Sequence, residues 1–249
     1  MTLVGNMPRF FVDSVSGNTI SIRGNDAYHI GRSLRMRLGD VITVCADRVE
    51  YRAKILSISD KEVVCDVLSA EKSENEPTVN VVLYQALPKS DKMDLIVQKA
   101  VELGVYKIVP VITARCVSRP AKSGYEKRVE RYNKIALEAA KQSGRGIVPT
   151  VSEFMTINEV IEKSKEFDLF FVPYECEEQK TLKEILTSKS DVKSVGFVIG
   201  PEGGFDLSET EKLHSSGIDT VTLGKRILRA ETAGEAVLAM TMYEIGDIN

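Results

Sequence analysis

The strongest constraint on the fold is a change in hydrophobic pattern near residue 78. Beyond it, short runs that are apolar throughout alternate with segments whose apolar residues recur at helical spacing. Strands that are apolar on both faces must be covered on both faces, and intervening helices make successive strands parallel. The sequence therefore predicts an α/β domain with a parallel sheet. Its strands are expected at 79–87, 105–112, 169–172, 195–199 and 220–223.

The predicted helices begin at recognisable capping signals. The first carries apolar residues at 93, 96, 97, 100 and 101, and Gly104 follows as a stop signal. In a capping box, a Ser or Thr precedes the helix and a Glu three residues later reaches back to it. We predict four such boxes: Thr156 with Glu159, Thr181 with Glu184, Ser208 with Glu211, and Thr232 with Glu235.

The residues before the change of pattern predict a small β-barrel-like unit of a kind that often binds RNA. Strands are expected at 10–12, 19–22, 41–44, 51–58 and 62–68, with a helical turn over 29–38. The polar segment 69–78 contains Pro77 and lacks periodicity, so we interpret it as a linker. Two domains are predicted, 1–72 and 73–249.

Composition excludes several classes of protein. The 249 residues are 43% hydrophobic, which excludes a disordered or fibrous chain, and no apolar run approaches the ~18 residues of a membrane span. We therefore expect a cytoplasmic protein that makes no membrane contact. The cysteines (45, 65, 116 and 176) and histidines (29 and 214) do not form a metal-ligand spacing. They predict buried thiols and no metal site.

Basic residues are concentrated in two places although the formal net charge is −3. The segment 115–145 has nine basic and three acidic residues, and Arg32, Arg35 and Arg37 form a second basic run. Local positive charge, not the total, attracts a phosphate backbone. A nucleic-acid surface and an ordinary solvated helix face both remain open for each cluster.

Ligands of open parallel sheets bind beyond the carboxyl ends of the strands, here the loops after Val172, Ile199 and Leu223. The second loop, 200–205, reads GPEGGF and does not match a phosphate-binding P-loop, although a plain tight turn remains possible. The third loop brings Arg229 and Glu231 to the start of a helix. It also contains the apolar Ile227 and Leu228, which suggests that it lines a binding site.

These motifs resemble those of the RsmE family of 16S ribosomal RNA uracil-N3 methyltransferases, in the SPOUT superfamily. The resemblance runs through MPRFF at 7–11, QKA at 98–100 with ELG at 102–104, GPEGGF at 200–205 and LGKRILRAETA at 223–233. Departures are modest. Ser90 stands where the family commonly has glycine, and Ala230 stands where threonine is usual.

The resemblance implies a C-terminal SPOUT domain with a deep trefoil knot, a PUA-like N-terminal domain and a homodimer. The implied activity is transfer of a methyl group from S-adenosyl-L-methionine to N3 of a specific uridine in 16S rRNA of the small ribosomal subunit. Two alternatives from other classes stay open: a non-catalytic RNA-binding protein with an inert α/β domain, and an enzyme that binds a nucleotide phosphate at 200–204.

The resemblance implies the cofactor contacts, while the proton acceptor and the RNA contacts are our own hypotheses from the chemistry. Water or the ribosome is the alternative proton acceptor. We expect Glu202 first, and Glu231 second, to accept the N3 proton, while Arg229 stabilises negative charge on the neighbouring carbonyl oxygens. The expected cofactor site comprises Val172, Pro173, Ile199, Gly200, Pro201, Glu202, Gly203, Gly204, Leu223, Gly224, Ile227, Leu228 and Arg229. The expected RNA contacts are Arg9, Arg32, Arg35, Arg37, Lys89, Arg115, Arg119 and Arg145.

Overall fold

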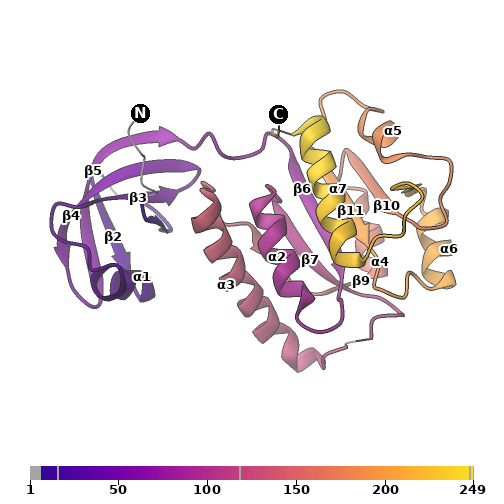
Figure 1. Cartoon of the computed structure of the whole chain (residues 1–249), viewed down its shortest axis with the longest axis horizontal. Coiled ribbons are helices and arrows are strands. Elements are labelled where there is room, and N and C mark those ends of the chain that lie inside the picture. The colour runs from indigo at the N-terminus through magenta and orange to yellow at the C-terminus, as the bar shows by residue number, and fades with distance from the viewer. Residues whose placement is uncertain (1–6, 16, 118, 247, 249) are drawn as a thin grey trace. The chain divides into compact units, whose positions relative to one another are not determined.

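The computed structural model describes residues 7–15, 17–117, 119–246 and 248 (Figure 1). The chain forms two compact units. One comprises the residues up to Glu76 together with Ala140–Val148, and the other comprises Pro77–Ala139 and the residues from Pro149 onward. Each unit has its own sheet and its own apolar core.

The first unit contains a five-stranded sheet in the order β1-β3-β4-β5-β2. Strand β1 runs parallel to β3, and the other pairs are antiparallel. Side chains that alternate along the strands, such as Ile20 and Ile22, fill the core. The strands are β1 (Arg9–Phe11), β2 (Thr19–Arg23), β3 (Val41–Ala46), β4 (Val49–Ile58) and β5 (Glu62–Lys72).

Two predictions for this unit need correction. The helical turn starts earlier than predicted, as α1 (Asn25–Tyr28), and continues as the π-helical turn η1 (His29–Ser33), so it ends well before residue 38. Arg35 then adopts a positive φ of 52°, which a continuing helix excludes. Strand β5 reaches Lys72, so the first four residues of the predicted linker are strand paired with β4.

The second unit contains a parallel sheet in the order β12-β10-β11-β6-β7-β8, with β9 also paired to β7. All of its strand pairs are parallel, as the apolar runs predict. The two short strands β8 and β9 were not predicted, since each has only two residues. The strands are β6 (Asn80–Ala86), β7 (Lys107–Ile112), β8 (Thr150–Val151), β9 (Met155–Thr156), β10 (Leu169–Pro173), β11 (Ser194–Ile199) and β12 (Asp219–Val221).

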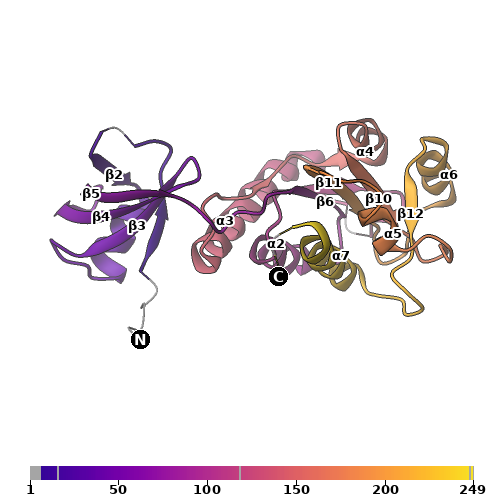
Figure 2. The ribbon, with the colours of Figure 1, turned by 90° about the horizontal axis from the view of Figure 1, so that it is seen from above.

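Helices cover both faces of this sheet (Figure 2). On one face, α2 (Lys92–Glu102), α5 (Leu182–Leu186) and α7 (Ala230–Ile245) pack together. On the other, α4 (Ile157–Ser164) and α6 (Leu207–Ser215) bury residues such as Val160 and Leu213 against the sheet. The 3-10 turn η2 (Lys122–Gly124) leads into the long helix α3 (Tyr125–Ser143). The predicted fold class, a parallel α/β domain with an N-terminal β-domain, is confirmed.

The capping predictions are half right. Thr156 and Thr181 form the predicted boxes with Glu159 and Glu184. The box predicted for Ser208 and Glu211 is wrong. Helix α6 is capped by Asp206, which forms a capping box with Glu209, so the box lies two residues before the predicted one. The box predicted for Thr232 is also wrong. Helix α7 already begins at Ala230, so Thr232 lies inside its first turn.

No helix in the described part of the chain has both the length and the apolar character needed to cross a membrane.

Candidate active site

The three predicted loops leave the sheet at one edge. Strands β10, β11 and β12 are parallel neighbours, so their carboxyl ends lie together. Val172 and Pro173 at the end of β10 pair with Thr220 and Val221 of β12, and Ile199 at the end of β11 pairs with Gln85 of β6. The sheet order therefore brings the loops after residues 173, 199 and 221 to one place, as the apolar runs predict.

The glycine loop, residues 200–204, is held by contacts from two other segments. Gly204 has a φ of +67°, and a Cβ at this position would lie 2.6 Å from Oε1 of Glu175 in the loop after β10. The carbonyl of Gly203 accepts a hydrogen bond from Arg115, at 3.1 Å. The ring of Phe205 packs beside Gly200, where a Cβ would come within 3.1 Å of it. The positive φ therefore favours glycine at Gly204, and a Cβ there would also displace the end of the Glu175 side chain.

Lys92 joins the two carboxylates that the sequence singles out. Its Nζ lies 3.0 Å from Oε1 and 3.2 Å from Oε2 of Glu231, and 3.7 Å from Oε1 of Glu202. The backbone N–H of Lys89 donates a hydrogen bond to that Glu202 oxygen, at 3.0 Å. The structure therefore brings Glu202 and Glu231 together as the Glu202–Lys92–Glu231 cluster. Sequence reasoning missed Lys92, and its position at the start of the helix after β6 was the available signal.

The two carboxylates of the cluster, Glu231 and Glu202, have different surroundings. Burial raises the pKa of Glu231, but its own backbone N–H, Lys92 and Arg229 together outweigh burial and hold the pKa below its usual range. A carboxylate with a lowered pKa stays ionised and is a weaker base. Glu202 has its Oε1 held by Lys89 and Lys92, and within the described residues its Oε2 forms no hydrogen bond. Of the two carboxylates, Glu202 thus keeps one oxygen that no donor within the described residues occupies.

The loop before α7 presents apolar side chains and backbone groups to its surroundings. Ile227 is 88% exposed, and Leu228 is half-buried. Within the described residues, none of the backbone N–H groups of 225–228 donates to another backbone group. Arg229 is exposed at the N-cap of α7 and, among the described residues, forms no ion pair. This loop offers an apolar side chain beside unused backbone donors.

The loop after β10 is fixed by Glu177. Its carboxylate accepts hydrogen bonds from Oγ1 of Thr220 at 2.6 Å and from the backbone N–H groups of Gln179 and Lys180. These three donors lower the pKa of Glu177 to about 2, with the Thr220 hydroxyl as the largest cause. The ionised carboxylate therefore ties this loop to β12.

The predicted RNA contacts fall into different environments. Arg145 is 4% exposed and forms a two-pronged pair with the equally buried Glu76, so its guanidinium has a structural role instead. Arg9 is also mostly buried and bonds to Glu50. Arg32 is exposed but pairs with Asp60 through two hydrogen bonds. The remaining candidates are exposed: Arg35, Arg37, Lys89, Arg115 and Arg119.

Metal-ligating side chains do not gather in the described part of the chain: no group of three His, Cys, Asp or Glu there could hold a metal ion. Three of the four cysteines are buried as predicted. The prediction is wrong for Cys176, which is exposed in the loop after β10.

Comparison with known families and proteins shows to which family the chain belongs. The family model described as an RNA methyltransferase domain matches residues 74–242, and that described as an RNA methyltransferase PUA domain matches residues 22–68. The ribosomal RNA small subunit methyltransferase E of Bacillus subtilis (strain 168) is 34% identical over 248 residues, covering 96% of this chain and 97% of the relative.

Solved structures agree with this. That of a ribosomal RNA small subunit methyltransferase E from Neisseria gonorrhoeae, bound to S-adenosyl methionine, has a TM-score of 0.87 and 31% identity, covering 98% of this chain and all of that one. A methyltransferase from Legionella pneumophila in complex with the same cofactor has a TM-score of 0.87 at 26% identity, covering 97% of this chain and 99% of that one. The chain therefore belongs to the ribosomal RNA small subunit methyltransferase E family.

Proposed function

We propose that this protein is an S-adenosyl-L-methionine-dependent methyltransferase that methylates N3 of a specific uridine in 16S rRNA of the small ribosomal subunit. The observation that carries the proposal is the Glu202–Lys92–Glu231 cluster at the edge where the three loops meet. It places a carboxylate with an unused oxygen beside loops suited to a nucleoside. Membership of the family named for this rRNA activity supports the substrate class.

The loop residues fit the cofactor. Backbone donors at 225–228 with no backbone partner can read the edge of an adenine ring, and the exposed Ile227 and half-buried Leu228 can cover its face. The other contacts would come from Val172, Pro173, residues 199–204, Leu223, Gly224 and Arg229. When bound, S-adenosylmethionine supplies an electrophilic methyl group.

The protein's own groups prepare the uracil. N3 becomes a good nucleophile only after its proton leaves, and Glu202 accepts that proton through Oε2. Lys89 and Lys92 hold Oε1, which fixes the orientation of the carboxylate. Arg229 stabilises the negative charge that develops on the neighbouring carbonyl oxygens. Glu231, whose pKa is lowered, positions Lys92 and does not take the proton itself.

The two domains predicted at 1–72 and 73–249 have different roles in this proposal. The PUA-like domain helps to bind the RNA, and the second domain transfers the methyl group. Exposed basic residues at 32, 35, 37, 89, 115 and 119 contribute to RNA binding, while Arg9 and Arg145 shape the first unit. Such binding should weaken steeply with salt, because each phosphate contact releases counterions. The protein acts in the cytoplasm, where its ribosomal substrate is found.

The protein also forms a homodimer in this proposal. Helix α7 carries exposed Met240 and Tyr243, and its packing partner α2 carries exposed Leu95. These apolar side chains suit burial against a second copy of the chain. Light scattering coupled to gel filtration should give twice the mass of the chain, and Tyr243→Glu should reduce it to the monomer mass. A monomeric wild-type protein at micromolar concentration would contradict the dimer.

Calorimetry with S-adenosylmethionine, paired with methyl-transfer assays, tests the proposal. Glu202→Gln should keep cofactor affinity within several-fold of wild type and lose turnover by about 100-fold, the scale of general-base catalysis. Glu211→Gln, which alters an exposed carboxylate of α6, is the matched control and should match wild type. Full turnover in Glu202→Gln would refute its role. A wild-type protein without affinity for the cofactor would refute the enzyme.

A further inference from the structure

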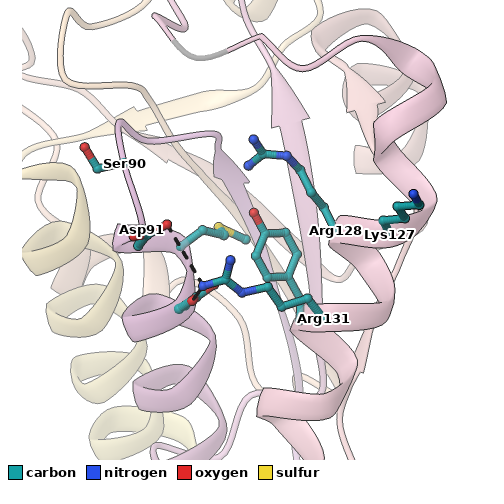
Figure 3. A pocket seen from close by; sticks show the side chains of 8 residues that line it. Ser90, Asp91, Lys127, Arg128 and Arg131 are labelled. Carbon is teal, nitrogen blue, oxygen red and sulfur yellow. Dashed lines mark hydrogen bonds and ion pairs between the residues drawn. The ribbon is translucent and has the colours of Figure 1, made fainter.

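A pocket of about 300 Å³ lies between the start of α2 and the first turns of α3 (Figure 3). We call it the flanking pocket. Its volume is at the lower end for small-molecule sites, enough for part of a nucleotide. It belongs wholly to the second unit. Its polar lining consists of Ser90, Asp91, Asp94, Lys127, Arg128 and Arg131.

The charges of the flanking pocket are unevenly paired. Arg131 forms an ion pair with Asp94 and lies 4.0 Å from Asp91, so one cation faces both carboxylates. Arg128 and Lys127 form no ion pair or hydrogen bond within the described residues. Arg128 is half-buried, and Figure 3 shows its guanidinium reaching from α3 toward the side of the pocket where Ser90 lies. A half-buried cation without a counter-charge favours an anionic ligand.

The floor of the pocket is formed by Met93 and Tyr132, whose side chains are almost fully buried, at 1% and 3% exposed. They close the cavity from below. The part of the pocket that a ligand can reach is therefore its polar wall, where Arg128 and Lys127 lie.

The same short segment of chain contributes to the Glu202–Lys92–Glu231 cluster and to the flanking pocket. Lys89 and Lys92 contact the carboxylates of the cluster, whereas Ser90, Asp91 and Met93, between and after them, line the pocket. Ser90 has a φ of 57°, a left-handed conformation that turns the chain between Lys89 and Lys92. The start of α2 therefore supplies residues to both places.

We propose that the flanking pocket binds a backbone phosphate of the RNA next to the target uridine, on Arg128 and Lys127. The assignment rests on the proposed function, since it presumes an RNA substrate at the Glu202–Lys92–Glu231 cluster. It adds a second point of attachment, which fixes the register of the RNA relative to the transferred methyl group. The pocket thus positions the target uridine; it does not take part in the chemistry.

Steady-state kinetics on small ribosomal subunits from cells lacking the gene test the assignment. Arg128→Gln should raise KM for the subunit about 10-fold or more, as expected for a lost hydrogen bond to a charged group, with kcat and cofactor affinity within about two-fold. The matched control is Lys134→Gln, which removes an exposed cation of α3 outside the pocket. It should change KM by less than two-fold. The salt dependence of RNA binding should fall by about one phosphate contact in Arg128→Gln only.

A second variant separates the proposal from simple damage to the fold. Asp94→Asn frees Arg131 from its closest carboxylate and adds an available cation to the pocket, so KM for the subunit should fall several-fold. A misfolded variant would not bind its substrate more tightly. If Arg128→Gln matches Lys134→Gln while the wild type methylates the subunit, the pocket assignment is overturned and the proposed function stands. A wild type that transfers no methyl group would instead overturn the proposed function.

Discussion

Lys92 is a single cation shared by two carboxylates from different loops. It lies 3.0 Å from Glu231 and 3.7 Å from Glu202, and each side chain of the cluster is only partly exposed. At such sites a charged hydrogen bond is worth more than on the open surface. Lys92 therefore links the two loops and, together with the backbone N–H of Glu231, helps to keep the pKa of Glu231 low.

Lys92→Met should lower turnover about 10-fold or more, because the carboxylates lose the charge that holds them. The pKa of Glu231 should rise, since Lys92 is one of the groups that lower it. NMR titration of the Glu231 carboxyl should show this rise directly. Lys99→Met, which breaks an ion pair with Glu102 on the same helix, is the control. An unchanged Glu231 pKa together with full turnover in Lys92→Met would contradict this role.

Gly204 offers a sharp test of the glycine loop. Gly204→Ala forces a left-handed conformation on alanine, costing ~1–2 kcal/mol, and drives Cβ toward Glu175. Cofactor affinity should fall at least about 10-fold. Gly217 has a similar φ of +73°, but nothing lies within 4 Å of a Cβ at this position. Gly217→Ala therefore has the same backbone cost without a steric contact. Equal cofactor affinities for the two variants, measured by calorimetry, would count against the glycine loop as part of the site.

At the scale of elements, strand positions were predictable because apolar side chains repeat over whole segments, whereas helix starts were predictable only in part: Thr156 and Thr181 cap their helices as predicted, and Ser208 and Thr232 do not. Asp206 and Ser208 are both good N-cap residues, and each has a Glu three positions later. Which of them becomes the N-cap of α6 depends on the residue at which the preceding loop ends. Phe205 is buried and fixes that point, so Asp206 becomes the cap. Tertiary packing therefore determines the N-cap of α6, which the local sequence pattern alone does not specify.

Asp206→Ala should therefore destabilise the protein by about 1 kcal/mol, the usual value for a lost N-cap, while Ser208→Ala should cost only a few tenths. Urea unfolding of the two variants measures the difference. The reverse order would mean that α6 begins at the originally predicted cap.

The loop after β10 should respond to acid through Glu177. Its folded pKa of about 2 lies below the ordinary value of 4.5, so its stabilising effect is complete above about pH 4.5 and is lost as the pH falls toward 2. Urea midpoints between pH 5 and pH 2 should fall less steeply in Glu177→Gln than in wild type. Glu178→Gln, at the exposed neighbouring position, is the control and should keep the wild-type slope.

At the scale of the whole molecule, both domains and the parallel sheet could be read from the sequence, but the return of Ala140–Val148 to the first unit could not. It depends on Arg145, whose guanidinium is held by Glu76 69 residues earlier in the chain. Arg145 lies in a basic segment and was therefore predicted to contact RNA. The sequence does not show whether a charged side chain is exposed or buried. Lys92 was missed for the converse reason: its two partners lie more than 100 residues away.

Glu76→Gln should destabilise the protein by about 1.5–3 kcal/mol, the range for hydrogen bonds to charged groups, because Arg145 loses the carboxylate that accepts from its Nε and Nη2. The glutamine oxygen can still accept from the N–H groups of Gly146 and Ile147, so the contacts to those two residues are kept. Glu74→Gln, an exposed neighbour, should have little effect. Chemical denaturation of both variants provides the comparison, and equal stabilities would show that the pair does not hold this segment.

Mass-spectrometric mapping of 16S rRNA, after the purified protein and S-adenosylmethionine have acted on small subunits from cells lacking the gene, tests the central claim most directly. The account predicts one new methyl group, on N3 of a single uridine, and its absence when Glu202→Gln is used. A methyl group on another atom or base, or no methyl group with the wild-type protein, would contradict it.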